Sequence, residues 1–451
     1  MTDSKKLNKK IIILGAGISG LSMAYVLKKR GYNPIIFESK SKTGGVIESI
    51  EEKGFIYDTG PSSLMVGDKR FFDMVDDLGL TNKLLKSSPE SNKRYILRDN
   101  ILHALLPNPK TIFKSKLFSF KGKISAVKDI FKTPKDNDLS MAEFASQHFG
   151  EEISNYAFDP LLSGIYAGNT EKLSLKAVFP FLYEARKEKG SIIRGMIARK
   201  KRIEKSGGSV KRHICSFTGG VQSLTNALTE YIGNSIFLNT TISSIVKKNN
   251  KYHISYNNEK GTINNEECDI LISTLPSYAL KDILWDSKLI DSLNNITFPK
   301  VGSLVLAYNK NNIKQNLDSF GFLVPSLEKK NFLGAIWSSV IFPNRAPNDK
   351  AIFTLYIGGA KNQKLLNLSD DRIISLIREE FEVLMGIDSS PILQNLNIIK
   401  NAIPQYNLGI NDIWENILKF EKENKNIYLT GNWRDKVSVS GCIEKAFNMN
   451  I

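Results

Sequence analysis

The chain has 451 residues, of which 41% are hydrophobic and 24% charged, and its formal net charge is +16. This composition is that of a globular protein with room for two or three domains, and it excludes the disordered and fibrous classes. The three cysteines stand far apart and the four histidines lack metal-ligand spacing, so we expect neither a disulfide framework nor a metal site. The charge favours an anionic ligand or surface, but no nucleic-acid-binding motif accompanies it.

The first stretch that carries chemistry is a glycine turn between a short apolar run and a helical pattern. The six residues of the turn are Gly15, Ala16, Gly17, Ile18, Ser19 and Gly20. Gly15 permits a tight turn, Gly17 a close approach of the backbone to a pyrophosphate, and Gly20 close packing of the helix, whose N-terminus then faces the phosphates. Glu38, followed by Ser39, ends the next apolar run at the distance expected for a carboxylate that binds an unphosphorylated ribose. The pattern predicts dinucleotide binding and leaves the dinucleotide open.

A second glycine turn follows at Gly44 and Gly45, where the backbone can pass close to a flat ring system or to the second phosphate. After a hairpin-like segment at 48–58 comes a further turn, Gly60-Pro61-Ser62-Ser63. A nicotinamide-dependent dehydrogenase would continue with βαβ alternation here, and this chain does not. The combination of the two glycine turns, the acid and the Gly-Pro turn resembles the amine-oxidase-like group of FAD-dependent oxidoreductases.

Periodicity and punctuation predict the remaining elements. We expect helices at 68–80, 151–162, 174–187, 221–231, 370–384 and 438–447, a hairpin at 92–107, and strands at 236–246, 252–256, 269–275 and 426–430. A further helix is expected to begin at Ser140, which has a capping-box spacing to Glu143. Several β-like segments between 301 and 359 predict a second sheet, and the basic run at 199–212 predicts a solvated loop. The last strand leads through Gly431 into a helix, so Val437, Ser438 and Val439 are expected to reach the flavin.

Aromatic and basic residues alternate between 109 and 134. The apolar members are Ile112, Phe113, Leu117, Phe118 and Phe120, and the basic members are Lys110, Lys114, Lys116, Lys121 and Lys123. Such a segment suits a membrane interface, with lysines directed to lipid headgroups, and it equally suits an amphipathic helix packed on its own protein. Both interpretations stay open.

The predicted fold is α/β, with a Rossmann-like FAD-binding domain, a mixed-sheet substrate domain and a helical segment that could rest on a membrane. The FAD-binding domain is discontinuous and comprises 1–90, 216–290 and 406–451. The substrate-binding and membrane-facing helical segment is 91–215, and the substrate-domain sheet is 291–405. No targeting segment or membrane-spanning helix is expected, so we predict a cytoplasmic protein, with peripheral contact to the inner face of the membrane as the variant.

Motifs in the second half of the chain narrow the resemblance. They are LLSGIYAGN at 161–169, GFLVPS at 321–326, SSVIFPNRAP at 338–347, AIPQY at 402–406 and GN at 431–432. Their order and coverage resemble the protoporphyrinogen oxidases and the related coproporphyrinogen oxidases. The resemblance implies FAD-dependent oxidation of a porphyrinogen by six electrons in haem biosynthesis, with molecular oxygen as acceptor. Because the cofactor carries this chemistry, no catalytic general acid or base is expected.

The resemblance also implies a substrate site. Arg94 would bind a propionate, Leu161, Leu323 and Phe342 would sandwich the macrocycle, and the backbone of Gly164 would lie near the reacting bridge. The implied flavin contacts include Ile242 in the strand at 236–246 as well as the glycine and serine residues named above.

The motifs also bear on the identity of the substrate. The resemblance favours protoporphyrinogen IX, because FPNRAP and FGFLVPS look like the protoporphyrinogen enzymes, and coproporphyrinogen III is the close alternative. A related flavin amine oxidase or carotenoid desaturase, or a flavin- or membrane-binding protein without catalysis, remain further alternatives. The oligomeric state stays open, a homodimer included.

Overall fold

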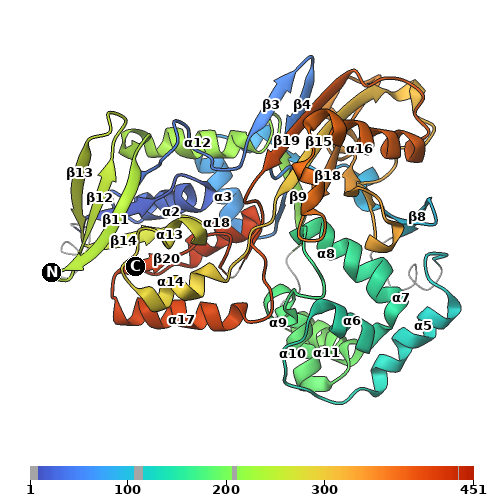
Figure 1. Cartoon of the computed structure of the whole chain (residues 1–451), viewed down its shortest axis with the longest axis horizontal. Coiled ribbons are helices and arrows are strands. Elements are labelled where there is room, and N and C mark those ends of the chain that lie inside the picture. Colours follow the sequence, from blue (N-terminus) through green and yellow to red (C-terminus); the bar gives the residue numbers. More distant parts are fainter. Residues whose placement is uncertain (1–8, 106–114, 206–210, 435) are drawn as a thin grey trace.

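The computed structural model describes residues 9–105, 115–205, 211–434 and 436–451. The molecule is elongated and has two lobes (Figure 1). One lobe holds a small parallel sheet and the C-terminal helix, and the other holds a larger sheet above a group of helices. The mixed α/β class predicted from the sequence is confirmed. None of the described helices is long and apolar enough to cross a membrane.

The first lobe is built on a five-stranded parallel sheet. In spatial order its strands are β10 (Ile236–Phe237), β2 (Ile35–Phe37), β1 (Ile11–Leu14), β14 (Ile270–Ser273) and β20 (Ile427–Leu429). The strands therefore come from separate parts of the chain, as a discontinuous domain requires. All four residues of β1 are buried, because a parallel strand is covered on both faces.

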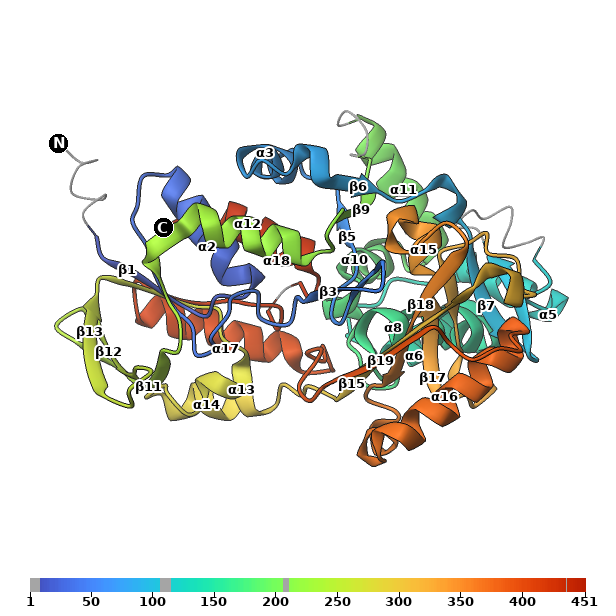
Figure 2. The same ribbon diagram turned by 90° about the horizontal axis from the view of Figure 1, so that it is seen from above.

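Helices cover both faces of this sheet (Figure 2). Ile11 and Ile13 pack in one core with α2 (Ile18–Lys29), α12 (Gln222–Ile232) and α18 (Val439–Asn448). Ile12 and Leu14 belong to the core of the opposite face. That face is covered by α13, α14 and α17, which span Ser277–Leu280, Ser287–Asn294 and Ile410–Glu423.

A separate antiparallel sheet lies beside the parallel one. It consists of β11 (Thr241–Lys248), β12 (Lys251–Asn257) and β13 (Ile263–Cys268). The strand predicted at 236–246 is two strands in the structure, β10 and β11, and of these only β10 joins the parallel sheet. Asn249 and Asn250 take positive φ values of 51° and 62°, which makes a tight hairpin turn and returns β12 onto β11.

The second lobe contains a seven-stranded mixed sheet. Its strands in order are β19 (Leu393–Ile399), β15 (Val301–Asn309), β18 (Lys350–Gly358), β17 (Phe332–Ile336), β16 (Gly321–Leu323), β7 (Arg94–Arg98) and β8 (Ile101–Leu105). The predicted hairpin at 92–107 is β7–β8, and its turn residues Asp99 and Asn100 have positive φ. Helix α16 (Asp370–Met385) packs on one face of the sheet, which leaves the other face to the site described below.

The helical group lies below this sheet (Figure 1). Its α-helices are α5 (Phe120–Val127), α6 (Met141–Phe149), α7 (Glu151–Ile153), α8 (Asp159–Tyr166), α9 (Leu175–Val178), α10 (Pro180–Lys189) and α11 (Ile192–Lys205), and a π-helical stretch, η4 (Ser154–Phe158), joins α7 to α8. The predicted capping box of Ser140 and Glu143 starts α6.

Helix α11 corrects the prediction of a solvated loop at 199–212. The Ser191 hydroxyl accepts the Arg194 N–H at 3.1 Å and so caps the start of the helix. Gly195 lets the helix approach α10, because a Cβ there would lie 2.5 Å from the Cβ of Ala185. Residues 206–210 of the same run lie outside the described part of the chain.

The remaining elements are short. They include β3 (Ser49–Glu52), β4 (Phe55–Asp58), β5 (Leu64–Val66), α3 (Lys69–Asp77), β6 (Leu84–Lys86), β9 (His213–Phe217), α15 (Ser338–Ile341) and the 3-10 turns η3 (Lys128–Phe131) and η8 (Pro343–Arg345). Of these, β5, α3 and β9 pack in the core of the first lobe, and η3 lies beside α5, α6 and α11 in the helical group. Strands β3 and β4 form the predicted hairpin at 48–58, and β5 and β6 both pair with β9. This group brings segment 58–63 to the junction of the two lobes.

Candidate active site

The two glycine turns meet and form one cradle. The Gly44 N–H donates to the Ala16 carbonyl at 2.8 Å, and a Cβ on Gly45 would lie 3.3 Å from the Cα of Gly17. Gly45 has a φ of +67°, which disfavours other residues. Backbone therefore lines the cradle on both sides, and it fits the pyrophosphate of a dinucleotide, which needs this close approach.

The first turn is held rigidly under the cradle. The Gly15 N–H donates to the Phe37 carbonyl at 2.8 Å, and the Thr274 hydroxyl donates to the Leu14 carbonyl at 2.8 Å. A Cβ on Gly20 would lie 1.9 Å from the Gly15 carbonyl oxygen, so this position admits only glycine without a backbone shift. No side chain caps the N-terminus of α2, which leaves its first N–H groups for an anion.

Glu38 lies at the end of β2 beside the cradle. Its carboxylate accepts the Ala16 N–H at 2.7 Å on one oxygen and the Lys40 N–H at 2.9 Å on the other, with the Ser39 hydroxyl at 3.4 Å. Each carboxylate oxygen has two acceptor sites, so the oxygen that accepts only the Ala16 N–H can still accept a ribose hydroxyl. The Thr240 N–H donates to the Glu38 carbonyl, which brings the start of β11, with Ile242, alongside.

A cavity of about 410 Å³ lies at the junction of the lobes. Most of the residues that line it belong to three groups. These are the loop after β4, the inner face of the seven-stranded sheet, and the C-terminal end of α8 together with the start of α18. They are Val46, Thr59, Gly60, Pro61, Ser62, Ser63, Ser163, Gly164, Ile165, Ala167, Val301, Gly302, Ser303, Leu333, Tyr356, Ile399, Ala402, Ile403, Asn432, Val437, Ser438 and Val439. Its volume is within the range of ordinary cofactor and ligand sites.

The cavity wall is nearly free of ionisable groups. Among the described residues that line it, Tyr356 is the single side chain that titrates. Burial raises the pKa of its hydroxyl, so the phenol stays protonated at physiological pH. Such a wall can hold a flat apolar ring and exclude water, but it offers no carboxylate or imidazole for proton transfer. The redox chemistry must therefore come from a cofactor.

The sheet fixes the loop that forms one side of the cavity. The Ser303 hydroxyl and the Asn397 amide both donate to the Thr59 carbonyl, at 3.0 Å and 3.2 Å. Ser303 pairs with Tyr356 on one neighbouring strand and with Asn397 on the other, so the three side chains form one row across the sheet. Tyr356 adds a hydrogen bond with Ser62. Ser303, Tyr356 and Asn397 therefore connect the loop after β4 to the large sheet across the cavity.

The C-terminal segment closes the opposite side. Ser438 caps α18 by accepting the Gly441 N–H at 3.1 Å, so the helix begins at the cavity wall. Gly431 has a φ of +141°, and the Tyr406 hydroxyl donates to the next carbonyl, that of Asn432, at 2.6 Å. Val437, Ser438 and Val439 line the cavity, and their contact with the flavin stays a prediction.

The predicted substrate residues are partly brought together. Leu323 faces α8, where a Cβ on Gly164 would lie 2.7 Å from its Cδ2. Leu161, on the same helix, is 41% exposed, whereas Phe342 is buried beside Arg345 in a separate small space. Within the described chain the main cavity is lined by Gly164 but not by these three large side chains.

Arg94 lies on the face of the sheet that carries Leu323 and Tyr356, as the register of β7, β16, β17 and β18 requires. Its guanidinium donates to the Ser91 carbonyl at 2.8 Å and stacks on the Phe320 ring at 4.2 Å. Burial lowers its pKa, but an arginine remains protonated. No carboxylate pairs with it in the described structure, so its charge is available to an anionic ligand.

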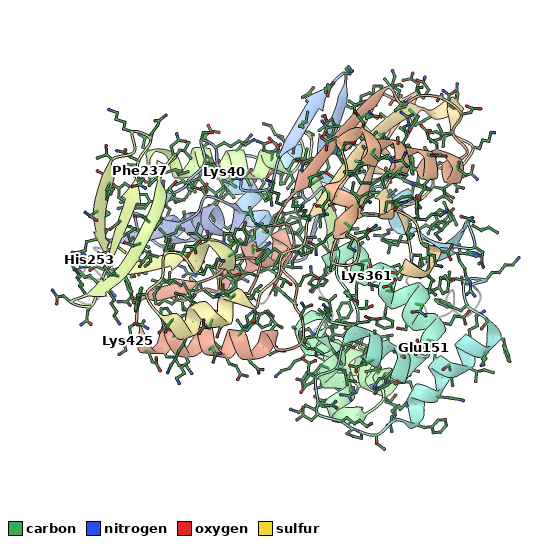
Figure 3. All side chains as sticks on the ribbon, in the orientation of Figure 1. Lys40, Glu151, Phe237, His253, Lys361 and Lys425 are labelled. Atoms are coloured by element: carbon green, nitrogen blue, oxygen red, sulfur yellow. The ribbon has the colours of Figure 1, made fainter. Side chains whose placement is uncertain are left out.

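A second link ties α8 to the sheet. Asp159, the first residue of α8, accepts the Ser326 N–H at 2.7 Å and pairs with Lys361 from the loop after β18. Figure 3 labels Lys361 between the large sheet and the helical group. Sequence analysis missed this link, together with Ser303, Tyr356 and Asn397, since no local spacing relates residues on separate strands.

The cradle fits a dinucleotide, and the neutral cavity next to it can hold a flat ring system; together they indicate an enzyme whose chemistry is carried by a bound dinucleotide cofactor. Comparison with known proteins supplies the family. The sequence model for flavin containing amine oxidoreductases matches residues 18–448, and the chain belongs to that family. It is a flavin-dependent oxidoreductase with FAD as cofactor, which confirms the prediction from the glycine turns.

Three similar proteins cover nearly the whole chain. Protoporphyrinogen oxidase 2, chloroplastic/mitochondrial, of Arabidopsis thaliana is 31% identical over 96% of this chain and 92% of its own length. Coproporphyrinogen III oxidase of Staphylococcus aureus is 26% identical over 97% of each chain. Among solved structures, a candidate protoporphyrinogen oxidase of Exiguobacterium sp. 255-15 superposes with a TM-score of 0.81 at 22% identity, covering 97% of each chain.

Proposed function

We propose that this enzyme oxidises a porphyrinogen to the porphyrin, with protoporphyrinogen IX as the preferred substrate and molecular oxygen as the final electron acceptor. The observation that carries the proposal is a cavity without acids or bases, flanked on the same sheet face by one unpaired arginine. The printed names of the full-length relatives support the same substrate class.

The residues of the chain position and shield the reacting groups. When bound, FAD supplies a hydride acceptor, and a porphyrinogen can lose its pyrrole protons to water as the macrocycle tautomerises. The wall formed by Gly164 and the sheet row of Ser303 and Tyr356 would hold the macrocycle against the cofactor. Gly164 has no side chain, so a flat ring can approach its backbone closely.

Arg94 would bind a propionate of the substrate. A guanidinium holds a carboxylate through two parallel hydrogen bonds and so fixes the edge of the ring. Lys361, which reaches α8 from the loop after β18, is already paired with Asp159. A cavity wall without a formal charge among its described residues suits a substrate with two propionates better than one with four, which favours protoporphyrinogen IX over coproporphyrinogen III.

The test is an aerobic assay of purified holoenzyme with the two porphyrinogens side by side, followed by porphyrin fluorescence. We expect growth of fluorescence with both and a higher kcat/KM for protoporphyrinogen IX. A clear preference for coproporphyrinogen III would replace the substrate in the proposal. Bound FAD that neither substrate reduces under anaerobic conditions would refute porphyrinogen oxidation altogether.

We further propose that the helical group rests on an anionic lipid surface. Large apolar side chains are exposed on α5, η3 and α11: Phe120, Ile124, Val127, Ile130, Phe131, Met196 and Ile197. The basic side chains among them are Lys121, Lys123, Lys128, Lys132, Arg194 and Arg199. The Arg194 guanidinium donates to the Lys132 carbonyl at 2.7 Å, so α11 continues the surface of η3.

One part of the predicted segment at 109–134 packs on the protein itself, and another part is exposed as a membrane-facing element would be. Leu117 and Phe118 are buried against Ile96, whereas Phe120 and Phe131 are 79% and 82% exposed. Residues 106–114, with Lys110, Ile112, Phe113 and Lys114, lie outside the described chain. Exposed phenylalanines among lysines suit insertion into a headgroup layer, where each basic residue contributes about 1 kcal/mol.

Vesicle flotation tests this surface. The wild-type holoenzyme should bind vesicles that contain phosphatidylserine, weakly at high salt, and Phe120→Ser with Phe131→Ser should reduce binding. Val383→Ser on α16 is the matched control, because Val383 is 80% exposed and lies on the other side of the large sheet. Equal binding by the double variant, or equal loss in the control, would refute lipid docking here.

A further inference from the structure

A buried ion pair joins the two sides of the site. Arg345 ends η8 on the substrate side, and Asp58 ends β4 immediately before the loop that lines the cavity. The Arg345 Nη2 atom lies 3.5 Å from the Asp58 Oδ2 atom, and the side chains are 2% and 3% exposed. Neither has another ionic partner in the described chain.

Both charges are also bonded to elements of the first lobe. Asp58 accepts the Ser49 hydroxyl at 2.5 Å and the Val221 N–H, just before α12, at 3.0 Å. Arg345 donates through Nη2 to the Ser216 hydroxyl on β9 at 2.6 Å. The pair therefore fixes β4, β9 and the start of α12 against η8 at one point.

The position of the pair relates it to the cofactor loop. Arg345 lines a space of about 10 Å³ together with Asp58, Ser62, Ser63 and Phe342. Ser62 and Ser63 line the main cavity from the other side. The loop at 58–63 thus has the sheet row of Ser303 on one side and the ion pair on the other.

Stability alone is a weak reason for this arrangement. Burial raises the pKa of Asp58 and lowers that of Arg345, so desolvation outweighs the attraction at both groups. The Arg345 Nη1 atom has no hydrogen-bond partner in the described structure. A buried pair of this kind is often replaceable by apolar side chains without loss of stability, whereas removal of one partner leaves an uncompensated charge.

We propose that Arg345 and Asp58 are positioning residues, which hold the loop at 58–63 so that the bound flavin and the substrate meet in a reactive geometry. Arg345 acts through Asp58 and the loop and touches neither reactant. The inference rests on the proposed function only for its turnover readout; the flavin readout does not depend on the substrate.

The experiment compares holoenzymes of Arg345→Met, Arg345→Lys and the double variant Asp58→Asn with Arg345→Met. We expect each Met variant to bind FAD, to change the visible circular dichroism of the flavin, and to lower kcat by about 10- to 100-fold with little change in KM. Arg345→Lys should recover part of both. The double variant should fold at least as well as Arg345→Met, because it leaves no unpaired buried charge.

Arg186→Met is the matched control. Arg186 is 2% exposed in α10, and its guanidinium donates to the carbonyl of Asn137, far from the cavity lining. An unchanged flavin spectrum and kcat in the Arg345 variants, or an equal change in the Arg186 variant, would overturn the positioning role. If the wild type fails to oxidise porphyrinogens, the proposed function fails, while the flavin spectrum still tests the loop.

Discussion

Gly17→Ala separates cofactor binding from folding at the cradle. Gly17 precedes α2 with φ −74° and ψ 179°, a conformation that alanine adopts freely. The nearest atom to its added Cβ is the Gly45 Cα at 4.0 Å, which is an ordinary van der Waals contact. The folded apo-protein therefore accommodates the methyl group, and the methyl group stands where the pyrophosphate passes.

The magnitudes follow from this geometry. Alanine in place of glycine before a helix destabilises the folded state by about 0.5–1 kcal/mol. Alanine also lowers the conformational entropy of the unfolded chain, which stabilises the protein by about 0.4–1 kcal/mol. The free energy of unfolding of the apo-protein therefore stays nearly unchanged. Displacement of the pyrophosphate by a methyl group should weaken FAD binding by about 100-fold, or about 2.7 kcal/mol. The holoenzyme should lose stability by the same linkage, since ligand at 100 times Kd contributes about 2.7 kcal/mol.

The assay is titration of apo-protein with FAD, followed by flavin fluorescence, together with urea unfolding of apo-protein. Gly20→Ala is the control, because its Cβ would lie 1.9 Å from the Gly15 carbonyl oxygen and should destabilise the apo-protein by about 1–3 kcal/mol. If Gly17→Ala binds FAD within about threefold of the wild type, the cradle is not the pyrophosphate site.

Three further predictions concern charged groups. Arg94→Ala should raise KM about 10- to 100-fold at unchanged FAD content, and Arg94→Lys should do so less, in steady-state assays; loss of FAD would contradict a substrate role. Burial would raise the pKa of Asp129, but hydrogen bonds headed by that from His148 lower it overall below 3.8, so its stabilisation is present above that pH and is lost as pH falls further. Asp129→Asn should therefore flatten the fall of unfolding free energy below about pH 4 in urea titrations. Lys361→Met should destabilise by about 1–2 kcal/mol, with FAD affinity intact, because Asp159 loses its partner.

The parts of the site that follow from local spacing could be predicted. The glycine turns and the capping box of Ser140 each depend on residues a few positions apart, and the backbone geometry of a turn or cap fixes which types fit. Glu38 follows from the fixed length of one strand–turn–helix–strand unit. The hairpin turns at Asp99 and Asn100 follow for the same reason, because a two-residue turn needs positive φ.

Pairings between distant segments could not be predicted. Strand β15 is buried at all but its last residue, so no alternation marks Ser303 as facing the cavity. The basic side chains of α11 hide its helical character, which depends on the Gly195 contact with Ala185. The Arg345–Asp58 pair exists only once both lobes are assembled.

The distribution of charge explains why the cavity residues could not be predicted from residue type alone. The chain carries a net charge of +16, yet the described cavity wall has no formal charge, and Arg94, which pairs with no described carboxylate, stands on the adjoining sheet face. A charge buried beside a neutral macrocycle would need a partner, whereas a charge at its edge can bind a carboxylate. In the proposed function, positive residues therefore stand where anions would bind, at the edge of the substrate and on the surface of α5 and α11. In this proposal the cofactor carries out the oxidation, and the fold holds the flavin ring and the macrocycle against each other in a neutral cavity.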